Sequence, residues 1–171
     1  LMGAVAAHGV DLVVFSPRGK CLARTVGETR GNVLLRRTQC RIADKEAESC
    51  RLARSFILGK VYNARWVLER ATRDHPQRVP VERLKTVSAQ LAEALPRIEA
   101  CAAPEELRGL EGEAAQRYFD AFASLILQQR DTFAFHGRSR RPPLDPSNAL
   151  LSFAYTLLAR DGPAALEGGG L

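Results

Sequence analysis

The 171-residue sequence lacks any apolar run that approaches the roughly 18 to 20 residues of a membrane-spanning helix. Its first ten residues are apolar, but no basic segment precedes them and no typical cleavage pattern follows, so they do not read as a signal peptide. Walker loops, dinucleotide-binding fingerprints, H-E-x-x-H motifs and nucleophile elbows are all absent. We therefore expect a soluble, cytoplasmic protein that has no membrane partner and falls outside those motif-defined enzyme classes.

Cysteine is also scarce. The four cysteines, at positions 21, 40, 50 and 101, form no C-x-x-C pair, and no histidine lies at a zinc-like spacing from them. A chain of this length with so few cysteines does not resemble a secreted disulfide framework. We expect free thiols in a reducing cytoplasm and exclude structural zinc and redox chemistry at these residues.

Aromatic residues make up only 6% of the chain and lysine contributes only four of its 25 basic residues, so arginine supplies 21. The hydrophobic fraction of 46% suffices for a core, and abundant Ala and Leu favour helices. The net charge is +6. Because the arginine fork pairs bidentately with phosphate, this bias favours an anionic partner such as nucleic acid. The alternative is a solvated surface whose arginines reflect a GC-rich genome.

The first thirty residues favour β structure. Residues 10–15 and 21–26 read as two strands joined by a turn at 16–19, and no third strand follows. An isolated hairpin is marginal in water, so we interpret this one as the end of a sheet whose beginning is absent. The fold class predicted is mainly α with a small N-terminal β portion, a β-hairpin remnant followed by a multi-helix domain.

Helical spacing dominates after residue 31. The predicted domains are the C-terminal part of a β domain at 1–30, a connector at 31–43 and a C-terminally incomplete helical domain at 44–171. The predicted helices cover 44–73 with Asp44 as cap, 81–102 with a kink or break at Pro96, 104–129, and 145–160 with Asp145 as cap.

A first candidate site is Glu111, which has Gly109 and Gly112 on either side. Each glycine costs a helix about 1 kcal/mol relative to alanine, so these two suggest that a second helix or a ligand approaches the backbone closely. In the functional interpretation Glu111 is a carboxylate ligand of a hard cation. In the alternative, Glu111 and Glu113 are surface charges and the glycines permit tight helix packing.

A second candidate is the basic loop at 133–143, which carries Arg138, Arg140 and Arg141 beside two prolines. Such a loop suits phosphate binding, because prolines limit the entropy lost on docking. A solvated loop is the alternative, and a lone loop histidine such as His136 is more often a surface group than a metal ligand. A third stretch, 31–39, reads as a connector, and Lys60 and Asn63 share one helix face in the related segment 59–65.

Four motifs occur in order: G-N-V-L-L-R-R-x-Q, G-K-x-x-N-x-R, L-R-G-x-E-G-x-A-A-x-x-Y-F, and R-x-R-R-P-P-x-D-P-x-N-A-L-L-S-F. In this order they resemble the CRISPR-associated spacer-acquisition integrase family, a metal-dependent endonuclease family of antiviral defence, over about residues 10 to 166. The resemblance implies DNA strand transfer that inserts new spacers into a CRISPR array. It also implies a divalent metal, Mg²⁺ or Mn²⁺, a homodimer, and a small ferredoxin-fold adaptation partner.

Residue by residue, the resemblance implies that Glu111 is the catalytic and metal-binding glutamate. It places Arg138, Arg140, Arg141 and Asn148 near the DNA path, with Arg36 and Arg65 as weaker DNA contacts. The expected chemistry is attack of a 3′ hydroxyl on a phosphodiester with metal-stabilised charge, which needs no protein nucleophile.

The family's metal-binding His and Asp have no matching positions here. The chain therefore reads as a fragment lacking both ends, and we expect it to be weakly active or inactive alone. Two hypotheses follow, a metal-dependent integrase or nuclease and a non-catalytic DNA-binding or dimerisation fragment. A helical scaffold with no DNA role ranks third.

Overall fold

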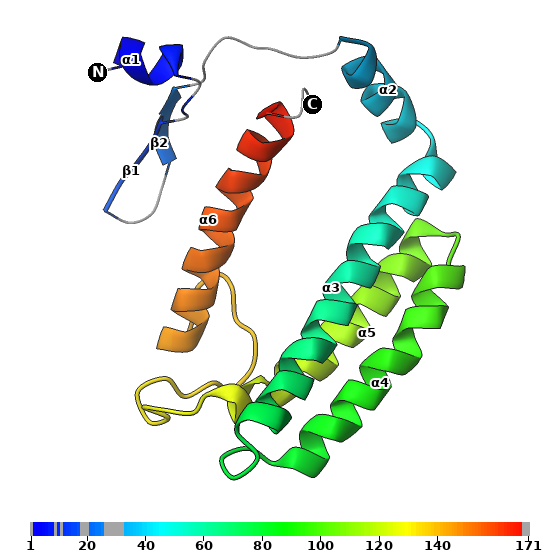
Figure 1. The fold of residues 1–171 in the computed structure, drawn as a ribbon, viewed down its shortest axis with the longest axis vertical. Helices are drawn as coiled ribbons and strands as arrows, with labels where there is room; N and C mark the ends of the chain where they lie inside the picture. Colours follow the sequence, from blue (N-terminus) through cyan, green and yellow to red (C-terminus); the bar gives the residue numbers. More distant parts are fainter. Residues whose placement is uncertain (1, 9, 11, 18–20, 26–32, 169–171) are drawn as a thin grey trace. The chain divides into compact units, whose positions relative to one another are not determined.

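The computed structural model describes residues 2–8, 10, 12–17, 21–25 and 33–168. Its contacts divide the chain into two compact units, Leu1–Arg41 with Ala149–Leu171, and Ile42–Asn148. The described residues are mostly helical and contain one small two-stranded sheet near the N-terminus, as Figure 1 shows. This confirms the predicted fold class. The domain boundaries at 30 and 43 stay predictions.

The first unit contains the predicted hairpin. Strands β1 (Leu12–Phe15) and β2 (Cys21–Thr25) pair antiparallel, with Val13 opposite Arg24 and an irregularity between Val14 and Phe15. Part of the turn predicted at 16–19 lies outside the described residues. A short helix that the sequence analysis did not predict, α1 (Met2–Ala7), precedes the hairpin, and the segment expected as a connector is helical as α2 (Val33–Ala43).

The second unit is an up-down-up bundle of three helices. Helices α3 (Glu46–Asp74), α4 (Val81–Ala100) and α5 (Pro104–Phe122) all contact one another, and short links make α4 antiparallel to the other two (Figure 1). A 3-10 turn η1 (Ala123–Leu125) ends α5. An irregular segment then leads to α6 (Pro146–Gly168), which continues into the first unit.

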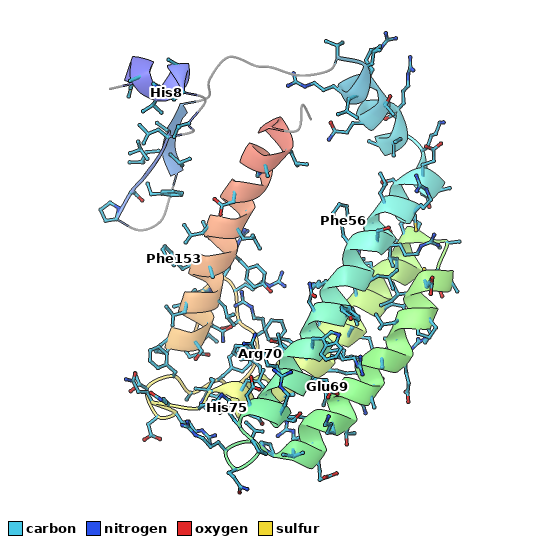
Figure 2. All side chains as sticks on the ribbon, in the orientation of Figure 1. His8, Phe56, Glu69, Arg70, His75 and Phe153 are labelled. Carbon is cyan, nitrogen blue, oxygen red and sulfur yellow. The ribbon has the colours of Figure 1, made fainter. Side chains whose placement is uncertain are left out.

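Apolar packing between the three helices forms the core of the bundle. The side chains of Leu68, Leu84, Leu91 and Ile98 have no exposed surface, and Leu107 is 2% exposed. The apolar residues of α3 extend beyond its buried face, because Phe56 is 78% exposed (Figure 2) and Val67 is also exposed. A three-helix bundle buries only the stripe that faces two neighbours, and these two residues lie outside it.

Several predicted helix ends need correction. Asp44 is not the cap of α3, because the helix begins at Glu46 and Lys45 precedes it without a side-chain cap bond. Pro96 does not break α4, which continues to Ala100, because Leu95 and Ile98 on either side pack into the core. The third helix ends at Phe122 rather than 129, and the last helix extends beyond residue 160.

Cys40, Cys50 and Cys101 are free thiols, as expected. Burial raises the pKa of the Cys101 thiol above its usual range. Within the described part of the chain, no helix is both long and apolar enough to cross a bilayer.

The core predicts the effect of one truncation. Leu91→Ala removes a fully buried side chain and leaves a cavity between the helices, so the free energy of unfolding should fall by about 2–5 kcal/mol. The matched control Leu52→Ala, at a 40% exposed position, should change it by about 0.5 kcal/mol or less. Urea denaturation of both variants measures the difference, and equal losses would contradict this assignment of the core.

Candidate functional site

Glu111 lies on α5 and faces α3 rather than open solvent. Its carboxylate accepts a hydrogen bond from the Lys60 ammonium, and the two side chains are 31% and 53% exposed. This pair connects the third predicted motif to the second. A half-exposed ion pair contributes only about 0–1 kcal/mol, so Lys60 orients the carboxylate but can be displaced from it at small cost in free energy.

The neighbouring carboxylate of the same motif points to the other helix. Glu113 accepts hydrogen bonds from Arg117 on its own helix at 2.6 Å and from Arg97 of α4 at 3.4 Å. Both carboxylates are partly exposed, so the alternative that Glu111 and Glu113 are surface charges stays open, although each forms an ion pair. Each is tied to a different neighbouring helix.

The two glycines that flank Glu111 do not serve helix packing. A Cβ atom built at Gly109 or Gly112 would meet no heavy atom of another described segment within 4 Å. The expectation that these glycines allow a tight helix contact is wrong, because both lie on the exposed side of α5. The alternative, close approach of a ligand to this face, stays a prediction.

The described residues do not by themselves form a metal site. They contain no group of three or more His, Cys, Asp or Glu side chains placed to hold one ion. Glu111 offers a hard oxygen donor of the kind that Mg²⁺ prefers, but its carboxylate pairs with the Lys60 ammonium rather than lying beside a second ligand. His136 is exposed on the basic loop.

The basic loop is anchored at its start by an aromatic cluster. Phe135 is 7% exposed, and its ring lies 4.9 Å from that of Phe122 and 6.1 Å from that of Phe119, both on α5. The Ser147 hydroxyl donates to the carbonyl of Phe133 at 2.7 Å. The loop is thus attached to the bundle before its arginines begin.

Asn148 anchors the rest of the loop. Its side chain is fully buried, and its Nδ2 donates to the carbonyl of Gly137 at 2.8 Å and to the Asp145 carboxylate at 2.6 Å. Its Oδ1 accepts from Arg138 Nη1 at 2.8 Å and from the backbone N–H of Ser139 at 3.0 Å. These four bonds use the full capacity of the amide. Asn148 therefore holds the loop in place and has no side-chain donor or acceptor left for DNA.

Asp145 caps α6 as the sequence predicts. Its Oδ1 accepts the backbone N–H of Asn148 at 2.7 Å. Burial alone would raise the pKa of this carboxyl, but the backbone and side-chain N–H groups of Asn148 outweigh it and leave the pKa below its usual range. Gly137 has a φ of 124°, a left-handed conformation that glycine adopts without strain, and this turn places its carbonyl against Asn148.

The predicted DNA contacts differ in their surroundings. Arg140 and Arg141 are exposed on the loop, whereas Arg138 is half-buried and bonded to Ser139 and Asn148. Arg65 is half-buried on α3, with its guanidinium 5.6 Å from the centre of the Trp66 ring. Arg36 is half-buried on α2 in the other unit. The structure thus brings Arg138 and Asn148 together and leaves Arg140 and Arg141 most accessible.

Two residues at the site do not follow from the sequence. The spacing within a single helix does not show which residue of α5 the Lys60 ammonium meets. Trp66 could have been noticed, because the only tryptophan of the chain lies among arginines at 65, 70 and 73.

Comparison with known proteins identifies the family. All 171 residues match the family described as CRISPR associated protein Cas1. The chain is 45% identical over its whole length to "CRISPR-associated endonuclease Cas1 1" of Chlorobaculum tepidum and 47% identical to "CRISPR-associated endonuclease Cas1 2" of Rhodospirillum rubrum. It spans 50% of each of these curated relatives.

Solved structures share the fold. A casposase bound to integration product superposes with a TM-score of 0.78 at 19% identity, covering 99% of this chain and 45% of that one. A Cas6-RT-Cas1–Cas2 complex gives 0.69 at 26% identity, covering 98% of this chain and 18% of that one. A Thermotoga maritima CAS1 protein gives 0.73 at 18% identity, covering 99% and 50%. With a match that extends from residue 1 to residue 171, the chain belongs to the CRISPR associated protein Cas1 family.

Proposed function

We propose that the protein to which this chain contributes is a CRISPR adaptation integrase and endonuclease, which inserts new spacers into a CRISPR array by metal-dependent DNA strand transfer. The observation that carries the proposal is the full-length match to the Cas1 family, together with relatives that are named endonucleases. The fold shared with a casposase is consistent with it.

Within this proposal, Glu111 is the catalytic carboxylate of the described part. It lies where α5 meets α3, is partly exposed, and has a single ammonium partner that a competing cation can displace at small cost. Arg140 and Arg141 contact DNA phosphates directly. Arg138 and Asn148 act mainly by fixing the shape of the loop that presents them.

The cofactor that we propose is Mg²⁺ or Mn²⁺, which would stabilise negative charge on the reacting phosphoryl oxygens. Glu111 supplies one oxygen ligand. One carboxylate does not hold such an ion tightly, and the described residues contain no group of three or more His, Cys, Asp or Glu side chains around one point, so the ion would also need ligands such as substrate phosphates. This chain alone should accordingly be weakly active or inactive.

The partners that we propose are DNA, both as incoming spacer and as CRISPR repeat, a small ferredoxin-fold adaptation protein, and a second copy of the protein. The net charge of +6 and the exposed arginines support the first. The similarity to a complex that contains Cas1 and Cas2 supports the second. The second copy rests on the family resemblance alone.

An alternative function is a non-catalytic DNA-binding or dimerisation role for this chain. The incomplete ligand set around Glu111 favours it, since a basic loop can bind phosphates without any metal. The two functions differ in metal-dependent strand breakage, which only an integrase or nuclease performs.

The first prediction concerns catalysis. The chain should bind branched DNA but cleave or join it weakly or not at all with Mn²⁺, and Glu111→Ala should abolish any activity that remains. Gel assays of strand cleavage and transfer at fixed salt measure this, with Glu93→Ala on the exposed face of α4 as the matched control. Robust metal-dependent activity that survives Glu111→Ala would exclude Glu111 as the catalytic carboxylate.

The second prediction concerns Arg140 and Arg141. If each contacts one duplex phosphate, the variant Arg140→Gln/Arg141→Gln should lower the slope of log affinity against log salt concentration by about 1.8. The variant Arg83→Gln/Arg108→Gln removes the same charge from α4 and α5 and should leave the slope nearly unchanged. Fluorescence anisotropy over a salt series measures both. Equal slopes for the two variants would mean that the loop makes no specific phosphate contacts.

The third prediction separates loop anchoring from direct contact. Asn148→Ala leaves the carbonyl of Gly137 and the N–H of Ser139 without their buried partner, which should cost about 1–3 kcal/mol of stability. The loosened loop should then be cut faster by trypsin after Arg138. Gln116→Ala, at an exposed amide on α5, is the control. If trypsin cut the Asn148→Ala variant no faster than the wild-type chain while DNA binding became weaker, a direct contact between Asn148 and DNA would be indicated instead.

A further inference from the structure

A cavity whose lining does not include Glu111 opens between the C-terminal end of α3 and the start of α4. Its volume is about 300 Å³, and its walls are Trp66, Glu69, Arg70, Thr72, Arg73, Val81 and Lys85. Glu69 and Arg70 are labelled on α3 in Figure 2. This set of residues is called the Trp66 pocket below. A cavity of this size lies at the small end of ligand pockets and accommodates one planar ring rather than a duplex.

Trp66 gives the pocket an aromatic wall that is about half exposed. Trp66 is 47% exposed, although burying a large aromatic side chain is strongly favourable. Tyr62 meets its edge, with ring centres 6.0 Å apart and planes at 62°. Arg65 lies 5.6 Å from the ring centre. These contacts orient the indole while leaving much of its surface accessible.

The charges around Trp66 do not balance. Arg65, Arg70, Arg73 and Lys85 line the pocket or contact a lining residue, and only Glu69 and Asp74 oppose them. Two positive charges are therefore left in excess.

The two carboxylates are fully engaged by this cluster. Hydrogen bonds from Lys85 and Ser88 hold the pKa of Glu69 below its usual range, and the Arg73 guanidinium does the same for Asp74. Asp74 accepts from Arg73 at 2.8 Å and from Arg70 at 3.3 Å, so one carboxylate is shared between two guanidinium groups. Both guanidinium groups retain N–H donors for an anion.

We propose that the Trp66 pocket binds one unpaired nucleobase and its adjacent phosphate in a single-stranded segment of DNA. The base stacks on the exposed face of Trp66, and Arg70 and Arg73 hold the phosphate. The proposal rests on the proposed function, since that supplies DNA as the ligand, and it adds a binding site whose lining does not include Glu111.

The combination of groups favours a nucleotide unit over an acidic protein segment. An acidic peptide neutralises the arginines but offers nothing to the uncovered indole face. A base and a phosphate, which are joined by one sugar, satisfy the aromatic wall and the charge excess together. A paired base cannot stack on Trp66 unless it leaves its duplex, which is why the pocket selects an unpaired strand.

The test uses the 171-residue chain, in which Trp66 is the only tryptophan and therefore reports directly on the pocket. Its fluorescence is titrated with a short oligothymidylate, an abasic strand of equal length, thymidine monophosphate, a duplex and polyglutamate. Binding of labelled strands is followed in parallel by anisotropy. We expect the oligothymidylate to quench Trp66 and to bind about 5- to 150-fold more tightly than the abasic strand, the range for one stacked base.

Two variants locate the phosphate contact. Arg70→Gln/Arg73→Gln should lower the salt slope for single-stranded DNA by about 1.4, whereas the charge-matched Arg83→Gln/Arg108→Gln should not. All four arginines are exposed, so circular dichroism should show unchanged folding. Trp66→Leu, followed by anisotropy, should reduce the preference for the oligothymidylate over the abasic strand to nearly onefold.

Each contrary result has a distinct meaning. DNA binding by anisotropy that leaves Trp66 fluorescence and the Arg70→Gln/Arg73→Gln variant unaffected overturns the pocket but not the proposed function. Failure to bind any DNA overturns both. Quenching by polyglutamate as strong as by the oligothymidylate overturns nucleobase recognition and assigns the pocket to an acidic protein partner. Equal affinity for thymidine monophosphate and the strand overturns the DNA assignment in favour of a free nucleotide.

Discussion

Burial of the leucine-rich interface between α3, α4 and α5 determines where every polar group of the bundle lies. Fully burying a leucine contributes about 1.5–3 kcal/mol, whereas an exposed ion pair contributes about 0–1 kcal/mol. The orientation of each helix about its axis is therefore set by burial of Leu68, Leu84 and Leu91. The ion pairs form between charged residues that this orientation brings close together. Glu111 meets Lys60, and Glu69 meets Lys85, because each lies at an edge of a buried stripe.

The basic loop depends on a different kind of interaction. A segment that carries three arginines and two prolines has little apolar surface to bury, and Phe135 alone fixes only its start. Asn148 compensates with a buried amide whose four hydrogen bonds join the loop to the first turn of α6. Arg138 belongs to this network through its bond to Asn148, whereas Arg140 and Arg141 are exposed to solvent. The loop thus separates residues that hold its shape from residues that can meet a ligand.

Much of the fold could be predicted from the sequence, because it depends on local patterns. The hairpin strands, the start of α5 at Pro104 and the Asp145 cap all follow from neighbouring residues. The sequence-based predictions fail where contacts between residues far apart in the chain determine the structure. Pro96 stays within a helix because Leu95 and Ile98 reach the core, and Phe56 is exposed because it lies outside the stripe of α3 that faces α4 and α5. The partners of Glu111 and the surroundings of Trp66 were also unpredictable from the sequence, because periodicity within one helix does not show which residue of another helix lies beside it.

Helix packing also gives different partners to Glu111 and Glu113, two carboxylates that the sequence alone does not distinguish. Glu113 has a cationic partner on each carboxylate oxygen, Arg117 on Oε1 and Arg97 on Oε2, so another cation would compete with two guanidinium groups. Glu111 pairs with Lys60, and opening that half-exposed pair costs about 1 kcal/mol or less. Binding an external cation with even millimolar affinity releases about 4 kcal/mol, which exceeds this cost. The availability of its carboxylate, and not only its place in the motif, therefore favours Glu111 as the ligand.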